Sequence, residues 1–144
     1  MQFKSESRSN MNASVSPKAR VFLLFCAVGL VPIALSYGVM PSVSMDFLYG
    51  IAVDSTNLAH IFRAVMGLYL GMALIWVLGA FNPALTRPAL FCCAVFMLGL
   101  AFGRGLSFAL DGMAHWLMSV YALLEITLGF LAVALLREQR QEDK

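Results

Sequence analysis

Charged residues are scarce in this sequence, and their scarcity excludes most classes of soluble protein. Only 12% of the 144 residues are Asp, Glu, Lys or Arg, whereas 60% are hydrophobic. A soluble domain usually carries about 25% charged residues. The formal net charge is only +2, and the cations are spread over predicted tails and loops, so the sequence has no basic face for nucleic acid. We therefore expect a membrane protein with no nucleic-acid partner.

Histidine and cysteine are also few, with two and three residues respectively. Neither His60 nor His115 is spaced from another His or Cys as metal ligands are. Cys26, Cys92 and Cys93 fall near predicted inner helix ends, where we expect apolar packing and no disulfide. The sequence also lacks a nucleophile–base pair and a phosphate-binding loop. We expect no metal and no cofactor, and whether the protein is an enzyme stays open, with the negative answer favoured.

Four apolar runs are long enough to cross a bilayer, which takes about 20 helical residues. They cover residues 21–40, 58–81, 89–110 and 116–136. We predict an all-α integral membrane protein whose four transmembrane helices form an antiparallel bundle, with short polar tails at residues 1–20 and 137–144. Because the first run exceeds the apolar core of a secretory signal, we expect it to be a retained span.

Lysine and arginine avoid two of the predicted connections. Residues 41–57 and 111–115 contain neither, whereas the two tails and the turn at residues 82–88 hold most of the ten cations. Short loops rich in Lys and Arg stay on the cytoplasmic side of a membrane. We therefore predict an inner-membrane protein with both termini in the cytoplasm.

The longest predicted connection, residues 41–57, mixes aromatic and aliphatic residues with Ser and Asp. It either lies at the outer interface, with its aromatic rings at headgroup level, or forms a lid that contacts a ligand. Residues 54–57 supply several helix N-cap candidates for the second span. Pro83 and Pro88 bracket a predicted turn at residues 82–87, which would join the second and third spans as an antiparallel hairpin.

Arginine occurs inside two of the predicted spans. Arg104, Ser107 and Asp111 are three and four positions apart, so they share one face of the third span. A guanidinium at membrane depth costs at least a few kcal/mol and persists mainly beside a carboxylate, a backbone carbonyl or water. The rest of the chain must supply these surroundings.

The second span carries polar and small residues at three- and four-residue steps, namely His60, Arg63, Gly67 and Gly71. Gly99 and Gly103 have the same small-residue spacing in the third span. We expect these glycines to allow close helix approach.

The fourth span supplies an acid, Glu125. By helical rise it lies about 15 Å beyond His115, close to the bilayer midplane, with Tyr121 one turn above it on the same face. Arg63 and Arg104 are about 9–10 Å deep, and their long side chains reach either inward to Glu125 or outward to the headgroups. From the sequence, both directions stay open.

Arg63 and Arg104 are two cations at a depth where Glu125 is the one acid. One positive charge at this depth therefore has no partner, unless Asp111 or an outer-loop Asp contributes. In one interpretation an anionic ligand group balances this charge. In the other, the charges snorkel outward or form an internal ion pair that fixes helix register. The first interpretation predicts a polar pocket in the outer half of the bundle, built from Arg63, Arg104, Glu125, Ser107, Asp111, His60 and Tyr121.

Two motifs resemble a known family. His60-x-x-Arg63-x-x-x-Gly67 and Gly103-Arg104-x-x-Ser107-x-x-x-Asp111-Gly112, with the later Glu125, resemble the bacterial membrane proteins grouped as domain of unknown function 4345. The resemblance covers about residues 20–136. It implies a fold and a polar motif set, with Arg63, Arg104, Ser107, Asp111 and Glu125 as one constellation, and no established activity. The family is similar in size and span number to the DoxX-like four-helix proteins, an analogy that concerns architecture alone.

We therefore expect a multi-pass membrane protein that binds a small anionic or amphiphilic ligand in this pocket. One alternative is a structural or accessory subunit of a membrane complex, whose charges lock the bundle. A second alternative is a lipid-modifying enzyme that uses Glu125 as its acid or base. The expected partners are the lipid bilayer, the ligand, and either a homo-oligomer or a partner membrane protein.

Overall fold

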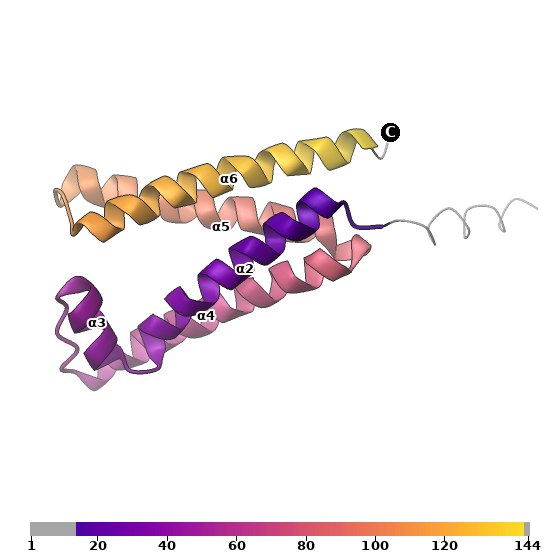
Figure 1. Cartoon of the computed structure of the whole chain (residues 1–144). Helices are drawn as coiled ribbons and strands as arrows, with labels where there is room; N and C mark the ends of the chain where they lie inside the picture. Colours follow the sequence, from indigo (N-terminus) through magenta and orange to yellow (C-terminus); the bar gives the residue numbers. More distant parts are fainter. Residues whose placement is uncertain (1–13, 143–144) are drawn as a thin grey trace, which may run out of the picture.

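Helices are the only regular elements in residues 14–142, the part of the chain that the computed structural model describes (Figure 1). They are α2 (Pro17–Gly38), α3 (Pro41–Tyr49), α4 (Thr56–Phe81), α5 (Pro83–Leu110) and α6 (Trp116–Glu142). All except α3 are long and apolar enough to cross a membrane. The predicted all-α bundle of four spans is confirmed, and the chain is a multi-pass membrane protein by the length and composition of its helices.

Two helices extend into the predicted polar tails. α2 begins at Pro17, where the fixed φ of proline suits the first helical position, and α6 continues to Glu142. Parts of both predicted polar tails are therefore helical. The remainder of the predicted tails, residues 1–13 and 143–144, lies outside the described residues.

The predicted six-residue turn between the second and third spans is wrong. α4 ends at Phe81 and α5 begins at Pro83, so Asn82 alone separates the two helices. The Asn82 side chain accepts a hydrogen bond from the Ala84 amide at 3.0 Å, which caps α5. Thr86 then donates to the carbonyl oxygen of Gly79 at 2.8 Å and fastens the two helix ends together. Pro88 lies inside α5, where proline has no N–H to donate to the carbonyl oxygen four residues earlier.

Helix α3 lies within the predicted outer connection and packs on α2 and α4. It ends at Gly50, whose φ of 65° is left-handed and therefore suits glycine. Its Met45 is fully buried, and Ser44 donates a hydrogen bond to the carbonyl oxygen of Ser36 in α2. Beyond it, Ser55 accepts from the Leu58 amide at 3.2 Å, so the predicted N-cap of the second span is confirmed.

The bundle consists of two helix pairs. α2 packs along α4, α5 packs along α6, and α4 against α5 joins the pairs, whereas α2 and α6 touch little. Figure 1 shows the pairs close together where α2 begins and α6 ends, which we call the terminal end, and further apart at the opposite α3 end. A fully buried Trp76 of α4 and Leu90 of α5 belong to the core between the pairs.

Two contacts at the terminal end hold the beginning of α2. Lys18 of α2 forms an ion pair with Glu138 of α6. Arg20 donates to the carbonyl oxygen of Ala80 at the end of α4, at 3.1 Å. The amino-terminal end of α2 is therefore tied to both neighbouring helices.

Close helix approach occurs at different glycines from those predicted. A Cβ on Gly38 would lie 2.6 Å from Met66, on Gly79 2.2 Å from Ala89, and on Gly129 2.6 Å from Leu98. The prediction of close contacts within the chain was wrong, because a Cβ at the predicted positions would meet nothing within 4 Å. These positions are Gly67, Gly71, Gly99 and Gly103. The spacing was read correctly, but it does not reveal which helix face is turned inward.

Candidate functional site

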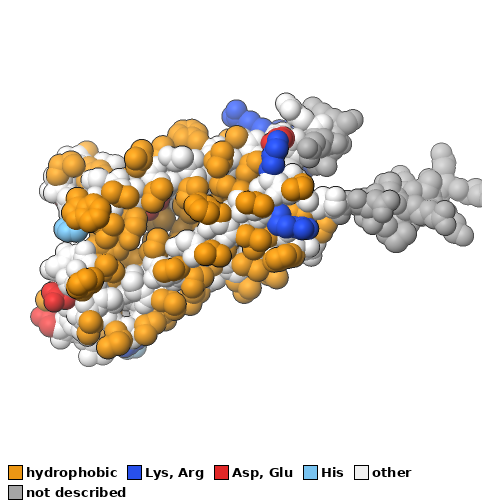
Figure 2. All heavy atoms as spheres, viewed as in Figure 1, with side chains coloured by type: hydrophobic (Ala, Val, Ile, Leu, Met, Phe, Trp, Pro, Cys, Tyr) orange, Lys and Arg blue, Asp and Glu red, His pale blue; other side chains and the backbone are white. Residues whose placement is uncertain are grey.

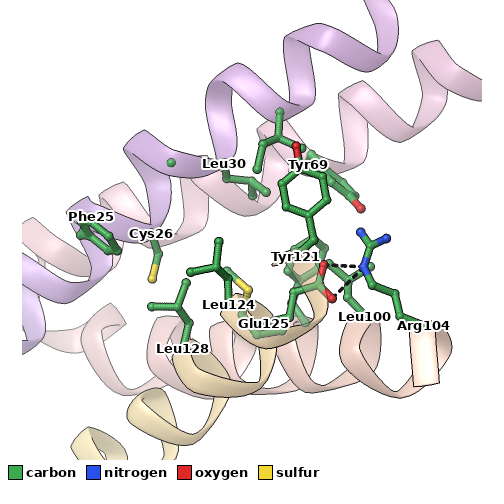
Figure 3. Close-up of a pocket in the computed structure, with 14 residues that line it drawn as sticks. Phe25, Cys26, Leu30, Tyr69, Leu100, Arg104, Tyr121, Leu124, Glu125 and Leu128 are labelled. Atoms are coloured by element: carbon green, nitrogen blue, oxygen red, sulfur yellow. Dashed lines mark hydrogen bonds and ion pairs between the residues drawn. The ribbon is translucent and has the colours of Figure 1, made fainter. Parts of the chain in front are cut away.

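Arg104 of α5 and Glu125 of α6 form an ion pair inside the bundle (Figure 3). The Arg104 Nε–H lies 2.9 and 3.0 Å from the two carboxylate oxygens of Glu125. The side chains are only 18% and 10% exposed. α5 and α6 approach closely here because Gly129, one turn beyond Glu125, leaves room for Leu98. Of the two directions left open by the sequence, Arg104 takes the inward one.

One face of α6 surrounds the guanidinium. Met118, Tyr121 and Glu125 follow one another at three- and four-residue steps, so they project from the same side of the helix. The Arg104 Nη1 atom lies 3.0 Å from the Met118 sulfur, and the guanidinium carbon lies 5.4 Å from the centre of the Tyr121 ring. A thioether is a weak acceptor. The terminal nitrogens of Arg104 therefore have no strong acceptor among the described residues.

The ion pair borders a cavity of about 170 Å³ to which all four long helices contribute. Arg104, Glu125, Tyr69 and Tyr121 supply its polar atoms, and its other walls are mainly aliphatic and aromatic. Figure 2 shows the surface hollowed between the two helix pairs. The site is therefore an apolar space with a charged pair at one side.

All four tyrosines of the sequence gather near this pair. The Tyr37 ring stacks on Tyr49 at 6.2 Å and meets Tyr69 edge-on at 5.7 Å, and Tyr121 covers Arg104. Sequence reasoning identified only Tyr121. The available signal was that Tyr37 and Tyr121 lie towards the α3 ends of their helices and Tyr69 lies near the middle of α4, but nothing in the sequence placed them on facing sides.

Tyr49 brings α3 to the edge of the site. Its hydroxyl oxygen is buried and has no hydrogen-bond partner of regular geometry among the described residues. Burial, followed by the neighbouring Tyr121 and Tyr37 phenols, raises the pKa of Tyr49 well above its usual value of 10.0. The phenol therefore stays neutral at physiological pH.

The remaining predicted site residues lie elsewhere. Ser107 and Asp111 hydrogen-bond to each other at 2.7 Å on the exposed end of α5. Arg63 is exposed and lines a separate hollow with Asp54 and Ser55, at the beginning of α4, and His60 is exposed one turn earlier. The constellation implied by the family resemblance is therefore divided, and only Arg104, Glu125 and Tyr121 are brought together.

This division changes the charge balance at the site. With Arg63 on an exposed face, the buried layer contains one guanidinium and one carboxylate, which neutralise each other. The excess positive charge expected from the sequence is not located at Glu125. Electrostatics at this depth therefore disfavour a ligand with a permanent charge.

The cysteines and histidines of the described region do not gather into a candidate metal centre. Within residues 14–142, no group of three or more His, Cys, Asp or Glu side chains is placed to hold a metal ion. Cys26 and Cys93 are buried free thiols and Cys92 is partly buried.

Comparisons with known proteins support the family that the two sequence motifs resemble. No curated protein and no solved structure matches the chain. The model of the family described as Domain of unknown function (DUF4345) matches residues 18–136, which cover α2 to α5 and most of α6. The matched segment includes Arg104, Glu125 and the whole cavity. The chain therefore belongs to the DUF4345 family of proteins.

Proposed function

We propose that this protein binds a small amphiphilic molecule that carries an acidic group, in the cavity beside Arg104 and Glu125, within the bacterial inner membrane. The observation that carries the proposal is the way the ion pair is made. Arg104 uses only its Nε–H for Glu125, so the N–H groups of Nη1 and Nη2 can donate hydrogen bonds to the carboxyl group of a ligand. Figure 3 shows these terminal nitrogens pointing away from Glu125.

The composition of the cavity supports the amphiphilic part of the proposal. Ligand sites are mostly apolar and contain a few polar groups that fix orientation. Here Arg104, Glu125 and the tyrosines provide the polar groups, and residues such as Leu30, Leu100 and Leu128 provide apolar walls. A buried ion pair that served only to lock two helices would require no adjoining space.

Analysis of copurified molecules tests this proposal. The full chain is extracted in mild detergent and compared with a double variant, Arg104→Met with Glu125→Leu, which replaces the pair by apolar groups of similar size. We expect mass spectrometry to find one small amphiphile or acid per wild-type chain and to find it lost from the variant. Equal amounts in both proteins, or none in either, would refute binding at this pair.

The accessory-subunit alternative has its own outcome in the same experiment. A stoichiometric membrane protein that copurifies with both the wild type and the double variant, without any small molecule, would favour assembly over ligand binding. The lipid-modifying alternative rests on Glu125 as acid or base. This alternative predicts that the Glu125→Gln variant still binds the molecule. It also predicts that a chemically altered lipid present in membranes with the wild-type protein is absent from membranes with the variant.

A further inference from the structure

We propose that the ligand is a single-chain carboxylic acid that enters the cavity sideways from the hydrocarbon of the bilayer, between α2 and α6. This inference rests on the proposed function, because it specifies the ligand of the same cavity. It has three parts, namely a lateral opening, a groove for the hydrocarbon chain, and a headgroup that complements a neutral ion pair.

The opening lies where α2 and α6 fail to meet. Phe25 and Gly29 of α2 and Leu124 of α6 line the cavity and are also exposed. A Cβ added at Gly29 would meet nothing within 4 Å. Because the exposed side chains around this gap are apolar, the cavity opens towards hydrocarbon.

The groove continues from the cavity towards the terminal end. A second hollow between α2 and α6 shares Phe25 and Leu128 with the cavity and extends past Leu131 to Leu135. From Glu125 to Leu135 the helix rises about 15 Å, which equals half of the ~30 Å hydrocarbon core and so the reach of one acyl chain. The hollow ends near Lys18, which forms an ion pair with Glu138.

The chemistry of the headgroup follows from the hydrogen-bond donors and acceptors that Arg104 and Glu125 present. Arg104 presents the N–H groups of its terminal nitrogens, and the Glu125 carboxylate retains lone pairs beyond the two that accept from Nε. A protonated carboxyl group carries one acceptor oxygen and one O–H donor, so it matches both partners without adding charge. A phosphate headgroup would bring a permanent negative charge to a layer that is already neutral. The cavity of about 170 Å³ suits a small headgroup rather than a phospholipid.

Direct binding of labelled hexadecanoic acid tests the inference. Scintillation-proximity binding is measured on the detergent-solubilised full chain, as wild type, as Gly29→Leu and as Gly71→Leu. Leucine at Gly29 fills the lateral opening, whereas at Gly71 it occupies an exposed face of α4 that lines neither cavity nor groove. Both changes replace a helical glycine that has free space around it, so neither is expected to lower stability.

We expect wild type and Gly71→Leu to bind hexadecanoic acid alike and Gly29→Leu to bind it at least about tenfold more weakly. Octanoic acid, which leaves the groove largely unfilled, should compete at least about tenfold less well. Methyl hexadecanoate, which has no O–H donor, should also compete poorly. Melting temperatures of the three proteins check that folding is intact.

Other results of this experiment distinguish a failure of the fatty-acid inference from a failure of the proposed function. Equal binding by Gly29→Leu, or equal competition by octanoic acid, would overturn the lateral entry and the groove while leaving a ligand at Arg104. No binding of hexadecanoic acid, together with a different copurified molecule that is lost from the Arg104→Met, Glu125→Leu variant, would overturn the carboxylic acid alone. No binding and no copurified molecule would refute the proposed function as well.

Discussion

Arg104 and Glu125 are the residues whose individual replacement should cost most. Both are largely buried, and each is the charged partner of the other. Removing one leaves the second as an uncompensated charge in a region of low dielectric, which is far more costly than the loss of the ion pair itself. Their energetic contributions are therefore expected to be coupled.

A double-mutant cycle measures this coupling. We expect Arg104→Met and Glu125→Leu each to lower the free energy of unfolding, and the double variant to lose less than the sum of the single losses. The interaction free energy should fall in the range of about 0.5–3 kcal/mol. Reversible unfolding in detergent provides the measurement.

Arg63 supplies the matched control for that cycle. It is the other arginine of a spanning helix that the sequence offered as partner of Glu125, but it is exposed beside Asp54 and Ser55. Arg63→Met and Glu125→Leu should therefore be additive within about 0.5 kcal/mol. Coupling of Glu125 to Arg63 and not to Arg104 would contradict the observed pairing.

Tyr49→Phe is predicted to preserve or increase stability at neutral pH. The Tyr49 hydroxyl is buried without a hydrogen-bond partner among the described residues, and leaving such a group unsatisfied costs about 1–3 kcal/mol. Removing the oxygen keeps the ring contact with Tyr37. A clear loss of stability at pH 7 would show that the hydroxyl has a partner.

The same substitution has a predicted alkaline phenotype. Burial raises the pKa of Tyr49 in the folded protein above its usual value of 10.0, so the folded state holds the phenolic proton more tightly than the unfolded state. This contribution to stability is complete below about pH 10 and is lost as the pH rises towards the folded pKa. Between pH 9 and pH 11 the Tyr49→Phe variant should therefore lose less stability than the wild type in thermal unfolding.

Among the helical elements, the α4–α5 junction has the least room for change. A Cβ at Gly79 would lie 2.2 Å from Ala89 and 3.1 Å from the Leu85 carbonyl oxygen. Gly79→Ala should therefore destabilise the protein by about 1–3 kcal/mol, because α4 and α5 must separate. The matched control is Gly71→Ala, where a Cβ meets nothing within 4 Å. Equal melting temperatures for the two variants would contradict the close approach at Gly79.

The sequence predicted the helices better than their ends and rotations. Four spans, the Ser55 cap and the acid at Glu125 follow from composition, capping chemistry and helical rise. The early start of α5 did not, because prolines are compatible both with a turn and with the first turns of a helix.

Which residues face one another was beyond the sequence for a physical reason. A membrane helix is apolar on every side, so no polar stripe marks its outer face. Arg63 and Arg104 therefore looked equivalent, although only Arg104 is turned inward. The gathering of Tyr37, Tyr49 and Tyr69 depends on three helix rotations at once, and no spacing within a single helix encodes it.

Over the described part of the molecule, most Lys and Arg residues lie at the terminal end, and the Asp residues lie at the α3 end. Lys18, Arg20, Arg87, Arg137 and Arg140 lie at the terminal end, where Figure 2 shows most of the blue side chains. Asp46, Asp54 and Asp111 lie at the α3 end. By the positive-inside rule we predict that the terminal end is cytoplasmic.

Reporter fusions test this orientation. Alkaline phosphatase, which is active only outside the cytoplasm, should be inactive when fused after Lys144 and active when fused after Gly112. A fluorescent protein that folds only in the cytoplasm should give the opposite pattern. Phosphatase activity after Lys144 would reverse the orientation or place an odd number of spans in the membrane.

The division into two helix pairs has a consequence for biosynthesis. Each pair comprises spans that are consecutive in the chain, with only short α3 between α2 and α4, and Asn82 alone separates the pairs. The ribosome therefore releases α2 and α4 as a complete pair before α5 and α6 have emerged, and their mutual packing requires only local contacts. The cavity forms between the two helix pairs, which are synthesised one after the other. It lies where α2 and α6 make few contacts with each other.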